Sequence, residues 1–355
     1  MTTNFQPDYR HTVAAVRNQR PARLPFYEHH IDEAVIMAAV LKADMTRPTN
    51  AEPAAWRAHF DKVCRFWRMA GYDTVSFEGG ICDILPDHGA ILGGRPGPIQ
   101  NRSDFERYPW ADIPRIFWEV YTPKMEALAA VMPPGMKALG GCGYGVFEIS
   151  EDLVGYQQLC LLYYDDPELF ADLYQRIGDL MVELWAELLR RYGDLFAICR
   201  MGDDLGFKTT TLLPPELILQ HVVPQHRRLV ELSHAAGKPF LLHSCGNIFN
   251  IMEELLATGI DAKHSNEDQI APFSRWIELY ADRIGLLGGF DVNTLCLEKP
   301  QTVFDYVYQK GREFRQHAHG YALGSGNSIP DYVPVDSYLA MLEAGRKIRA
   351  DEGCV

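Results

Sequence analysis

Residues 238–246 read KPFLLHSCG, and the rest of the chain can be interpreted outward from this stretch. The apolar run that follows Pro239 is typical of a buried strand, and His243 and Cys245 come two residues apart at its end. Side chains alternate faces along a strand, so these two side chains should point the same way. The apolar spacing that follows predicts a helix over residues 246–259, ended by its last glycine.

Seven further segments have the same strand-like character, and each is followed by a helical stretch. Strands that alternate with helices predict a parallel sheet, and eight such strands can close into a (β/α)8 TIM barrel. A doubly wound open sheet is the alternative, but it calls for a phosphate-binding glycine fingerprint after the first strand, which this sequence lacks. The seven segments are residues 24–28, 72–77, 136–141, 195–201, 260–264, 283–288 and 320–323.

The sequence predicts a single domain over residues 1–355, in which residues 1–23 form an N-terminal helical extension. A chain of 355 residues, of which 47% are hydrophobic, can bury one large core. Within it, residues 10–19 and 153–191 are helical in pattern. The Gly- and Pro-rich residues 89–97 predict a long loop, and a loop of this length in a compact domain is usually functional or mobile.

Polar residues gather at or just after the C-terminal ends of the predicted strands. In a TIM barrel this rim holds the active site, because the loops that follow the strands converge there. We therefore expect the catalytic, metal-binding and substrate-binding groups among these residues. They are Glu78, Asp83, Asp203, Asp204, His243, Cys245, Asn266, Glu267, Asp291, Ser325 and Asn327.

Composition excludes several classes of partner. The formal net charge of −13 argues against a nucleic acid or an anionic membrane surface, since no basic block compensates it. No apolar run approaches the roughly 20 residues that span a bilayer, and the first residues lack the apolar block of a signal peptide. The 8 cysteines show neither a CxxC pair nor framework spacing, which fits a reducing compartment. We expect a cytoplasmic protein.

Four motifs resemble the uroporphyrinogen decarboxylase superfamily, which also contains methyltransferases that act with corrinoid proteins and with thiols. The motifs are RHTVAAVRNQRPARLP at residues 10–25, DILP at residues 83–86, HSCG at residues 243–246 and GGFD at residues 288–291. The resemblance covers nearly the whole chain, and the order of its motifs is fairly specific. It implies a single barrel, commonly a homodimer.

Two branches of this superfamily compete for the chain. If the chain resembles the true decarboxylases of this superfamily, the resemblance implies an Arg-Gln-Ala-Gly-Arg stretch after the first strand, which holds the porphyrin carboxylates. Residues 27–32 read YEHHID at this place, so the arginines are missing, although Asp83 matches the decarboxylase aspartate. A porphyrin polycarboxylate needs a cationic cleft, because unpaired buried charges are costly. Decarboxylation therefore stays the alternative function.

The resemblance implies that the methyltransferase branch holds zinc with a His-x-Cys pair and a later cysteine. His243 and Cys245 match the pair, and Ser325 stands in the loop where the later cysteine is expected. A neutral hydroxyl is a poor zinc ligand beside a thiolate. Either a carboxylate completes the zinc site or the protein has no zinc. The candidate carboxylates are Glu78, Asp204 and Glu267.

The expected function is transfer of a methyl group from a small methyl ether or methylamine donor to a separate corrinoid protein. Alkoxides are poor leaving groups, so a Lewis acid or a proton donor at the donor heteroatom would lower the barrier. The chain lacks the Asp-x-His-x-x-Gly signature with which corrinoid proteins hold their cofactor. Cobalamin is therefore expected only on the partner protein.

In this interpretation His243 and Cys245 bind the metal, and Asp204, Glu267 and Asp83 are the catalytic residues. Substrate binding is expected from Glu78, Asp203, Asn266, Asp291, Ser325 and Asn327. Several of these have a purely structural alternative, since an Asp or Glu after a strand often caps a helix. A zinc-free barrel that binds a small molecule or a folate-like ligand is the second alternative function.

Overall fold

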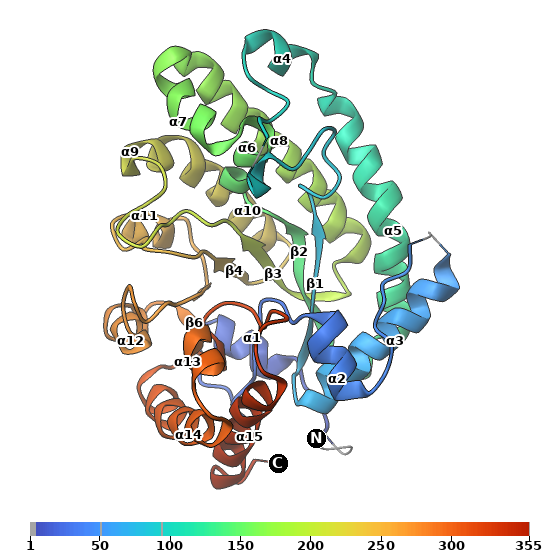
Figure 1. The fold of residues 1–355 in the computed structure, drawn as a ribbon, viewed down its shortest axis with the longest axis vertical. Helices are drawn as coiled ribbons and strands as arrows, with labels where there is room; N and C mark the ends of the chain where they lie inside the picture. The colour runs from blue at the N-terminus through green and yellow to red at the C-terminus, as the bar shows by residue number, and fades with distance from the viewer. Residues whose placement is uncertain (1–4, 50–51, 94, 355) are drawn as a thin grey trace.

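Seven strands form one parallel sheet in the computed structural model, which describes residues 5–49, 52–93 and 95–354. The strands follow chain order from β1 to β7 across the sheet. Figure 1 shows the sheet curled, with the helices outside it. The parallel α/β arrangement that the sequence predicts is confirmed. The strands are β1 (Thr74–Gly80), β2 (Lys137–Gly143), β3 (Phe196–Gly202), β4 (Phe240–His243), β5 (Ala262–His264), β6 (Gly285–Phe290) and β7 (Tyr321–Ser325).

Residues 24–28, which the sequence predicts as the first strand, lie beside β7 and form only an isolated bridge there. Phe26 pairs with Leu323 in parallel orientation. Toward β1 the contact is made by a side chain, because Ser76 Oγ donates to the carbonyl oxygen of His29 at 2.6 Å. The protein is therefore a curled, TIM-barrel-like sheet of seven parallel strands. Its completion into an eight-stranded barrel stays a prediction.

Helices connect successive strands and cover the outside of the sheet (Figure 1). No helix in the described ranges is both long and apolar enough to cross a membrane. The helices are α1 (Arg10–Val16), α2 (Ala38–Leu41), α3 (Pro53–Ala70), α4 (Arg102–Arg107), α5 (Ile113–Val131), α6 (Val146–Val154), α7 (Tyr156–Asp165), α8 (Pro167–Tyr192), α9 (Pro215–Leu217), α10 (Val223–Ala235), α11 (Met252–Leu256), α12 (Phe273–Tyr280), α13 (Val292–Leu297), α14 (Pro300–His317) and α15 (Val335–Asp351), with short 3-10 or π turns at Glu33–Met37, Ala90–Leu92, Trp110–Asp112 and Ile218–Val222.

The helix predicted over residues 246–259 is wrong in its first half, because α11 begins only at Met252. Gly246 has a φ of 76°, and Asn247 N donates to Phe207 O at 2.6 Å in an antiparallel bridge. A Cβ atom on Gly246 would lie 2.2 Å from backbone atoms of the loop after β3. Packing of these two loops against each other therefore fixes the chain after β4.

The continuous helix predicted over residues 153–191 is also wrong, since α6 runs into this range and is followed by α7 and α8. Gly155 separates the first two with a φ of 87°, a conformation that favours glycine. Asp166 caps the start of α8 with its side chain, and Pro167 occupies the first helical position, where its missing N–H costs nothing. The first of these helices matters most, because it reaches the site.

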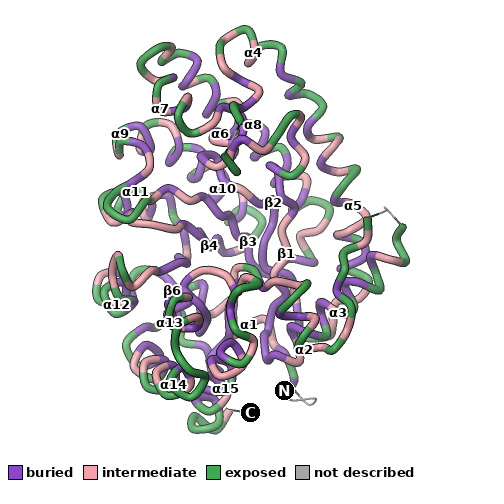
Figure 2. Tube along the Cα trace, viewed as in Figure 1, coloured by how far each residue is buried: buried purple, intermediate pink, exposed green. Residues whose placement is uncertain are grey.

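Helix α1 closes the N-terminal end of the curled sheet and leaves the C-terminal end open. A Cβ atom on Gly285, the first residue of β6, or on Gly320, just before β7, would lie 2.2 Å from the carbonyl oxygen of Ala15 in α1. Figure 2 shows the central strands buried and the outer helix faces exposed. Small and apolar side chains fill the interior of the sheet beside α1, among them Ala197, Ile198, Leu241, Ala262, Leu287 and Ala322.

Candidate active site

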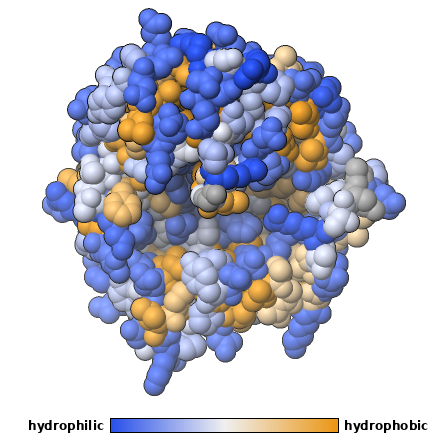
Figure 3. Space-filling view, turned by 45° about the horizontal axis from the view of Figure 1, so that its top comes forward, coloured by the Kyte–Doolittle hydropathy of each residue, from blue (hydrophilic) through white to orange (hydrophobic). Residues whose placement is uncertain are grey.

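A cavity of about 570 Å³ opens at the C-terminal ends of the strands. Figure 3 shows a hollow near the centre of this face, ringed mainly by hydrophilic side chains. Its walls come from β1, β2, β3 and β4 and the loops that follow them, from residues 29–47, from the loop after β7, and from α3, α5 and α6. The residues of the predicted site that line it are Glu78, Asp83, Asp204, His243 and Asn327.

Asp204 and His243 line the cavity, and Cys245, which does not line it, lies against them, so that three different donor atoms come together beside the cavity. Nε2 of His243 lies 3.4 Å from Cys245 Sγ and 3.7 Å from Asp204 Oδ1. All three donor atoms lie within 4.8 Å of one another. Tetrahedral zinc, with bonds of about 2.0 Å to nitrogen and about 2.3 Å to sulfur, holds these two atoms about 3.5 Å apart. The donor types and their spacing therefore fit a zinc ion, and we call this set the donor triangle.

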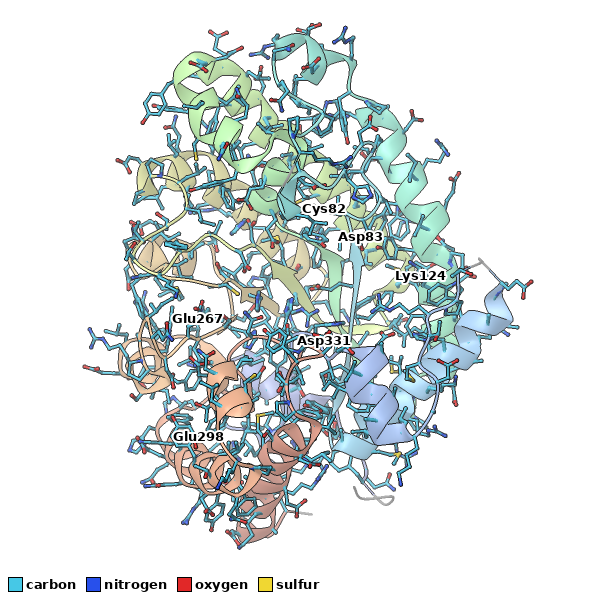
Figure 4. All side chains as sticks on the ribbon, in the orientation of Figure 1. Cys82, Asp83, Lys124, Glu267, Glu298 and Asp331 are labelled. Carbon is cyan, nitrogen blue, oxygen red and sulfur yellow. The ribbon has the colours of Figure 1, made fainter. Side chains whose placement is uncertain are left out.

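Neighbouring loops hold the sulfur corner of the donor triangle in place. Asp204 Oδ1 accepts a hydrogen bond from Cys245 N at 2.8 Å, and Asn327 Nδ2 donates to Cys245 Sγ at 3.2 Å. Glu267 supports the next residue, because its Oε1 accepts from Gly246 N at 3.2 Å. Glu267 does not line the cavity, and Figure 4 shows it on the α12 side of the molecule, away from Asp83. The loops after β3, β5 and β7 thus converge on Cys245 and Gly246 at the end of β4.

Burial favours the neutral form of every member of the donor triangle. It raises the pKa of the Cys245 thiol, and the charge of Asp204 raises this pKa further. Burial also raises the pKa of Asp204 and lowers the pKa of His243 well below its usual value. A bound divalent cation would favour the deprotonated thiol and carboxyl instead.

Two further imidazoles flank His243. The ring of His29 stacks on it with centroids 3.8 Å apart and lines the cavity. Nδ1 of His264 lies 2.7 Å from Nδ1 of His243, and burial lowers the pKa of His264 to about 3. Burial likewise lowers the pKa of His29. The sequence indicated neither a role for His264 nor this stacking, since His264 belongs to none of the motifs identified in the sequence.

Ser325, which stands where the resemblance implies a third zinc ligand, turns its side chain toward Glu28. Its hydroxyl donates to Glu28 Oε2, and its backbone N–H donates to Glu28 Oε1 at 2.8 Å. Both residues are buried, and burial raises the pKa of Glu28 to about 8. The predicted role of Ser325 in substrate binding stays a prediction, since Ser325 does not line the cavity.

The Glu28→Gln variant is expected to remove part of the pH dependence of stability. Glu28 has a pKa of about 8 in the folded chain against an ordinary value of 4.5, so the folded state holds a proton that the unfolded state has lost. Its contribution is therefore fully present below about pH 4.5 and is lost as the pH rises toward 8, by up to about 1.4 kcal/mol per pH unit. Urea unfolding between pH 5 and 8 should show a flatter profile for the variant. Parallel profiles would contradict the prediction.

Asp203 points away from the cavity and anchors α6. It is fully buried, and its Oδ1 accepts from the backbone N–H groups of Phe147 and Glu148, both at 3.1 Å. Nε2 of His226, on α10, lies 2.6 Å from its other oxygen. This arrangement fixes the start of α6, and with it Glu148, against the end of β3. The predicted role of Asp203 in substrate binding stays a prediction, since Asp203 does not line the cavity.

Asn266 and Asp291 make contacts of the same structural kind. Asn266 Oδ1 accepts from Gly289 N at 3.0 Å, which ties the loop after β5 to β6. Asp291 caps α13 by accepting from Asn293 N at 2.7 Å, and its second oxygen accepts from Asp268 N at 2.7 Å. Neither lines the cavity, and their predicted roles in substrate binding stay predictions.

Glu148 is a cavity residue that sequence reasoning missed. It lies in the first turn of α6, where its Oε2 accepts from Gly145 N at 3.2 Å. Burial raises its pKa well above the ordinary value, and the charges of Asp204 and Asp203 add to this effect. Burial thus favours the protonated form of this carboxyl group, which faces the cavity near the donor triangle. The spacing of apolar residues from Val146 onward was the signal that could have placed it on a helix.

Arg200 is a second residue that sequence reasoning missed, and it neutralises Glu78. Its Nε donates to Glu78 Oε1 at 2.7 Å, and its Nη1 donates to the carbonyl oxygen of His29 at 3.0 Å. It also donates to Ser76 Oγ at 2.8 Å, although only 2% of its surface is exposed. The guanidinium therefore ties the segment after residues 24–28 to β1 and β3 beneath the cavity.

The far wall of the cavity is aromatic and carries one lysine. The ammonium of Lys124 lies 4.4 Å from the ring centre of Tyr121 and 5.2 Å from that of Trp56. Burial lowers the pKa of Lys124. Asp83 accepts from the Tyr121 hydroxyl at 3.1 Å, and Asp83, Tyr121 and Lys124 all line the cavity. Figure 4 shows Asp83 and Lys124 both to the right of centre in this view.

Comparisons with known proteins come from a family model and from solved structures. The model of the family described as "Uroporphyrinogen decarboxylase (URO-D)" matches residues 96–348. A methyltransferase from Methanosarcina mazei superposes with a TM-score of 0.70 at 15% identity, over 95% of this chain and 97% of that chain. An intracellular xylanase from Thermoanaerobacterium saccharolyticum gives a TM-score of 0.43 at 12% identity, over 96% and 99% of the two chains. The search of curated proteins gives no match. At these identities the structural likeness shows the fold alone.

Proposed function

Because this chain belongs to the uroporphyrinogen decarboxylase family, we propose that it is a zinc-assisted methyltransferase that passes a methyl group from a small methylated donor to a separate corrinoid protein. The donor triangle of Asp204, His243 and Cys245 carries the proposal. It offers nitrogen, sulfur and oxygen ligands at zinc spacing, beside a cavity large enough for a small molecule. A methyl ether or a methylamine is the proposed donor.

Charge balance in the cavity disfavours the alternative, decarboxylation of a porphyrinogen. Among the described residues of the wall the cations are Arg47, Lys124 and Arg200. Arg200 is paired with Glu78 at 2.7 Å, and Arg47 is paired with Glu33 at 2.9 Å. A porphyrin polycarboxylate would leave most of its charges without a cationic partner, at a large desolvation cost.

Zinc held by Asp204, His243 and Cys245 would act as a Lewis acid on the oxygen or nitrogen of the donor. Glu148, whose protonated form burial favours, would donate its proton to that atom as the bond to the methyl carbon breaks. The bonding electron pair stays on the oxygen or nitrogen. The acceptor on the corrinoid protein supplies the pair for the new bond, and the donor leaves as an alcohol or amine.

The aromatic wall would bind the rest of the donor molecule. Trp56, Phe60, Phe77 and Tyr121 line the cavity opposite the donor triangle. An organic group packed against these rings would be held with its methyl group toward the triangle, and water would be excluded from the reacting atoms. Phe60 and Phe77 pack edge to face with ring centres 5.4 Å apart, which stiffens this surface.

The Gly202→Ala variant is expected to lose about 10-fold or more in kcat/KM while folding normally. A Cβ atom at this position would lie 3.7 Å from His29, 3.8 Å from His243 and 3.9 Å from Glu148, all ordinary contact distances. It would fill the space where these three side chains meet, and one added methyl group in a pocket costs about 1–3 kcal/mol of transition-state binding. Unchanged thermal stability and zinc content, measured on the same preparation, are the controls. Full activity would show that the substrate does not reach the space between His29, His243 and Glu148.

Methyl transfer to free reduced cobalamin tests the proposed function. The purified chain, supplied with one equivalent of zinc, is mixed with a panel of methyl ethers and methylamines. We expect the reduced-cobalamin absorbance to disappear together with formation of the demethylated donor, which mass spectrometry quantifies. The same chain stripped of metal is the control. Release of carbon dioxide from a carboxylate substrate without any methyl transfer would favour the decarboxylase alternative.

A further inference from the structure

A chain of hydrogen bonds runs from the donor triangle into the buried interior. Nδ1 of His243 lies 2.7 Å from Nδ1 of His264, and Nε2 of His264 lies 3.0 Å from the carbonyl oxygen of Ser325. His264 is completely buried and does not line the cavity. It therefore cannot touch a substrate, and any role it has at the site passes through His243.

The contact with Ser325 fixes where the hydrogen of His264 sits. A carbonyl oxygen only accepts hydrogen bonds, so Nε2 of His264 must carry the hydrogen and donate it. The ring packs edge to face against Tyr27, with centroids 4.8 Å apart, and its hydrogen-bond partners among the described residues are His243 and Ser325, neither of them a carboxylate. A buried imidazolium without a counter-charge is costly, so the ring is neutral and its Nδ1 carries a lone pair.

This assignment determines the tautomer of His243 in turn. Two nitrogens 2.7 Å apart need one hydrogen between them, and His264 Nδ1 has none to give. Nδ1 of His243 therefore carries the hydrogen, which leaves a lone pair on Nε2, the atom that lies 3.4 Å from Cys245 Sγ and 3.7 Å from Asp204 Oδ1. We infer that His264 is a positioning residue that locks His243 in the one tautomer able to bind a metal in the donor triangle.

The same series of hydrogen bonds gives Ser325 a role that needs no contact with the metal. Both its backbone N–H and its hydroxyl donate to the carboxyl group of Glu28, which holds the residue in one orientation. Its carbonyl oxygen is thereby aimed at His264. Metal-binding histidines generally depend on an acceptor for their second N–H, and losing that partner typically lowers metal affinity by about 10- to 100-fold.

Nitrogen-15 NMR of the metal-free chain tests the tautomers directly, with His243→Gln used to assign the His243 signals. We expect His243 protonated on Nδ1 and His264 protonated on Nε2. The reverse assignment would overturn the inference. The measurement needs no zinc, so it stays informative even if a variant at His264 does not fold.

Zinc affinity in a pair of variants supplies the second test, which rests on the proposed function. His264→Leu removes the acceptor and should weaken zinc binding by about 10- to 100-fold, with the His243 signals shifted toward the Nε2–H tautomer. His264→Asn restores an oxygen acceptor near the place of Nδ1 and should recover most of the affinity. A folded His264→Leu chain with wild-type affinity would refute the inference. A wild-type chain that shows the expected tautomers but binds no zinc would refute the proposed function alone.

Discussion

Replacing Cys245 by alanine is expected to abolish zinc binding and to slow methyl transfer by on the order of 10³-fold. The change removes the sulfur of the donor triangle and leaves only an imidazole and a carboxyl group, and two protein ligands are fewer than zinc sites have. Lewis-acid activation supplies several kcal/mol, and each 1.4 kcal/mol is about tenfold in rate. Zinc per chain by plasma mass spectrometry and the methyl-transfer rate measure the two effects.

The matched control is Cys296→Ala on α13, a partly buried thiol that does not line the cavity. It should keep both zinc and activity. A Cys245→Ala chain that still binds one zinc with wild-type affinity would contradict the assignment of this thiol. His243→Ala should behave as Cys245→Ala does, because it removes the nitrogen that both other donors face.

The same assay separates the carboxylates that the sequence left open as third ligand. Asp204 places an oxygen 3.7 Å from His243 Nε2, whereas Glu267 supports Gly246 from outside the cavity wall. Glu78 forms a salt bridge with Arg200. Asp204→Asn should therefore lower zinc affinity, while Glu267→Gln should leave it close to that of the wild type.

Sequence patterns predicted the repeating parts of the fold well, because each strand carries its own local signal. Buried parallel strands appear as short apolar runs, and seven of the predicted segments match β1 to β7 within a few residues. The chain after β4 could not be predicted in this way. Its shape depends on a bridge between Asn247 and Phe207, which are far apart in sequence and carry no helix-breaking pattern that identifies the contact.

The candidate site could be predicted only as a set of strand ends. Asp203 and Asp204 are neighbours at the end of β3, and adjacent residues of an extended chain face opposite ways. One caps α6 and the other faces Cys245, but the pattern does not say which, because the end of a strand is uncertain by a residue. The partnership of Ser325 with Glu28 spans 297 positions and arises only because the first segment lies beside the last strand.

Glu148 escaped prediction for a different reason, since no pattern in the sequence indicates that α6 reaches the cavity. Its replacement by glutamine is expected to slow methyl transfer from simple methyl ethers by about 10²- to 10⁴-fold. Glutamine keeps the size of the side chain and can still accept from Gly145 N, but it cannot deliver a proton to the leaving oxygen. Zinc content should stay the same, because the donor triangle is untouched.

A series of donors with different leaving groups distinguishes proton donation by Glu148 from a structural role. An ether whose alcohol or phenol is strongly acidic needs little help from an acid, so the Glu148→Gln deficit should shrink as leaving-group pKa falls. Glu151→Gln is the matched control, because this residue lies on the same helix, its pKa is raised by burial to about 8, and it does not line the cavity. Its rates should stay near those of the wild type across the series. An equal deficit for every donor in Glu148→Gln would mean that the side chain positions the substrate or the start of α6 and gives no proton in the transition state.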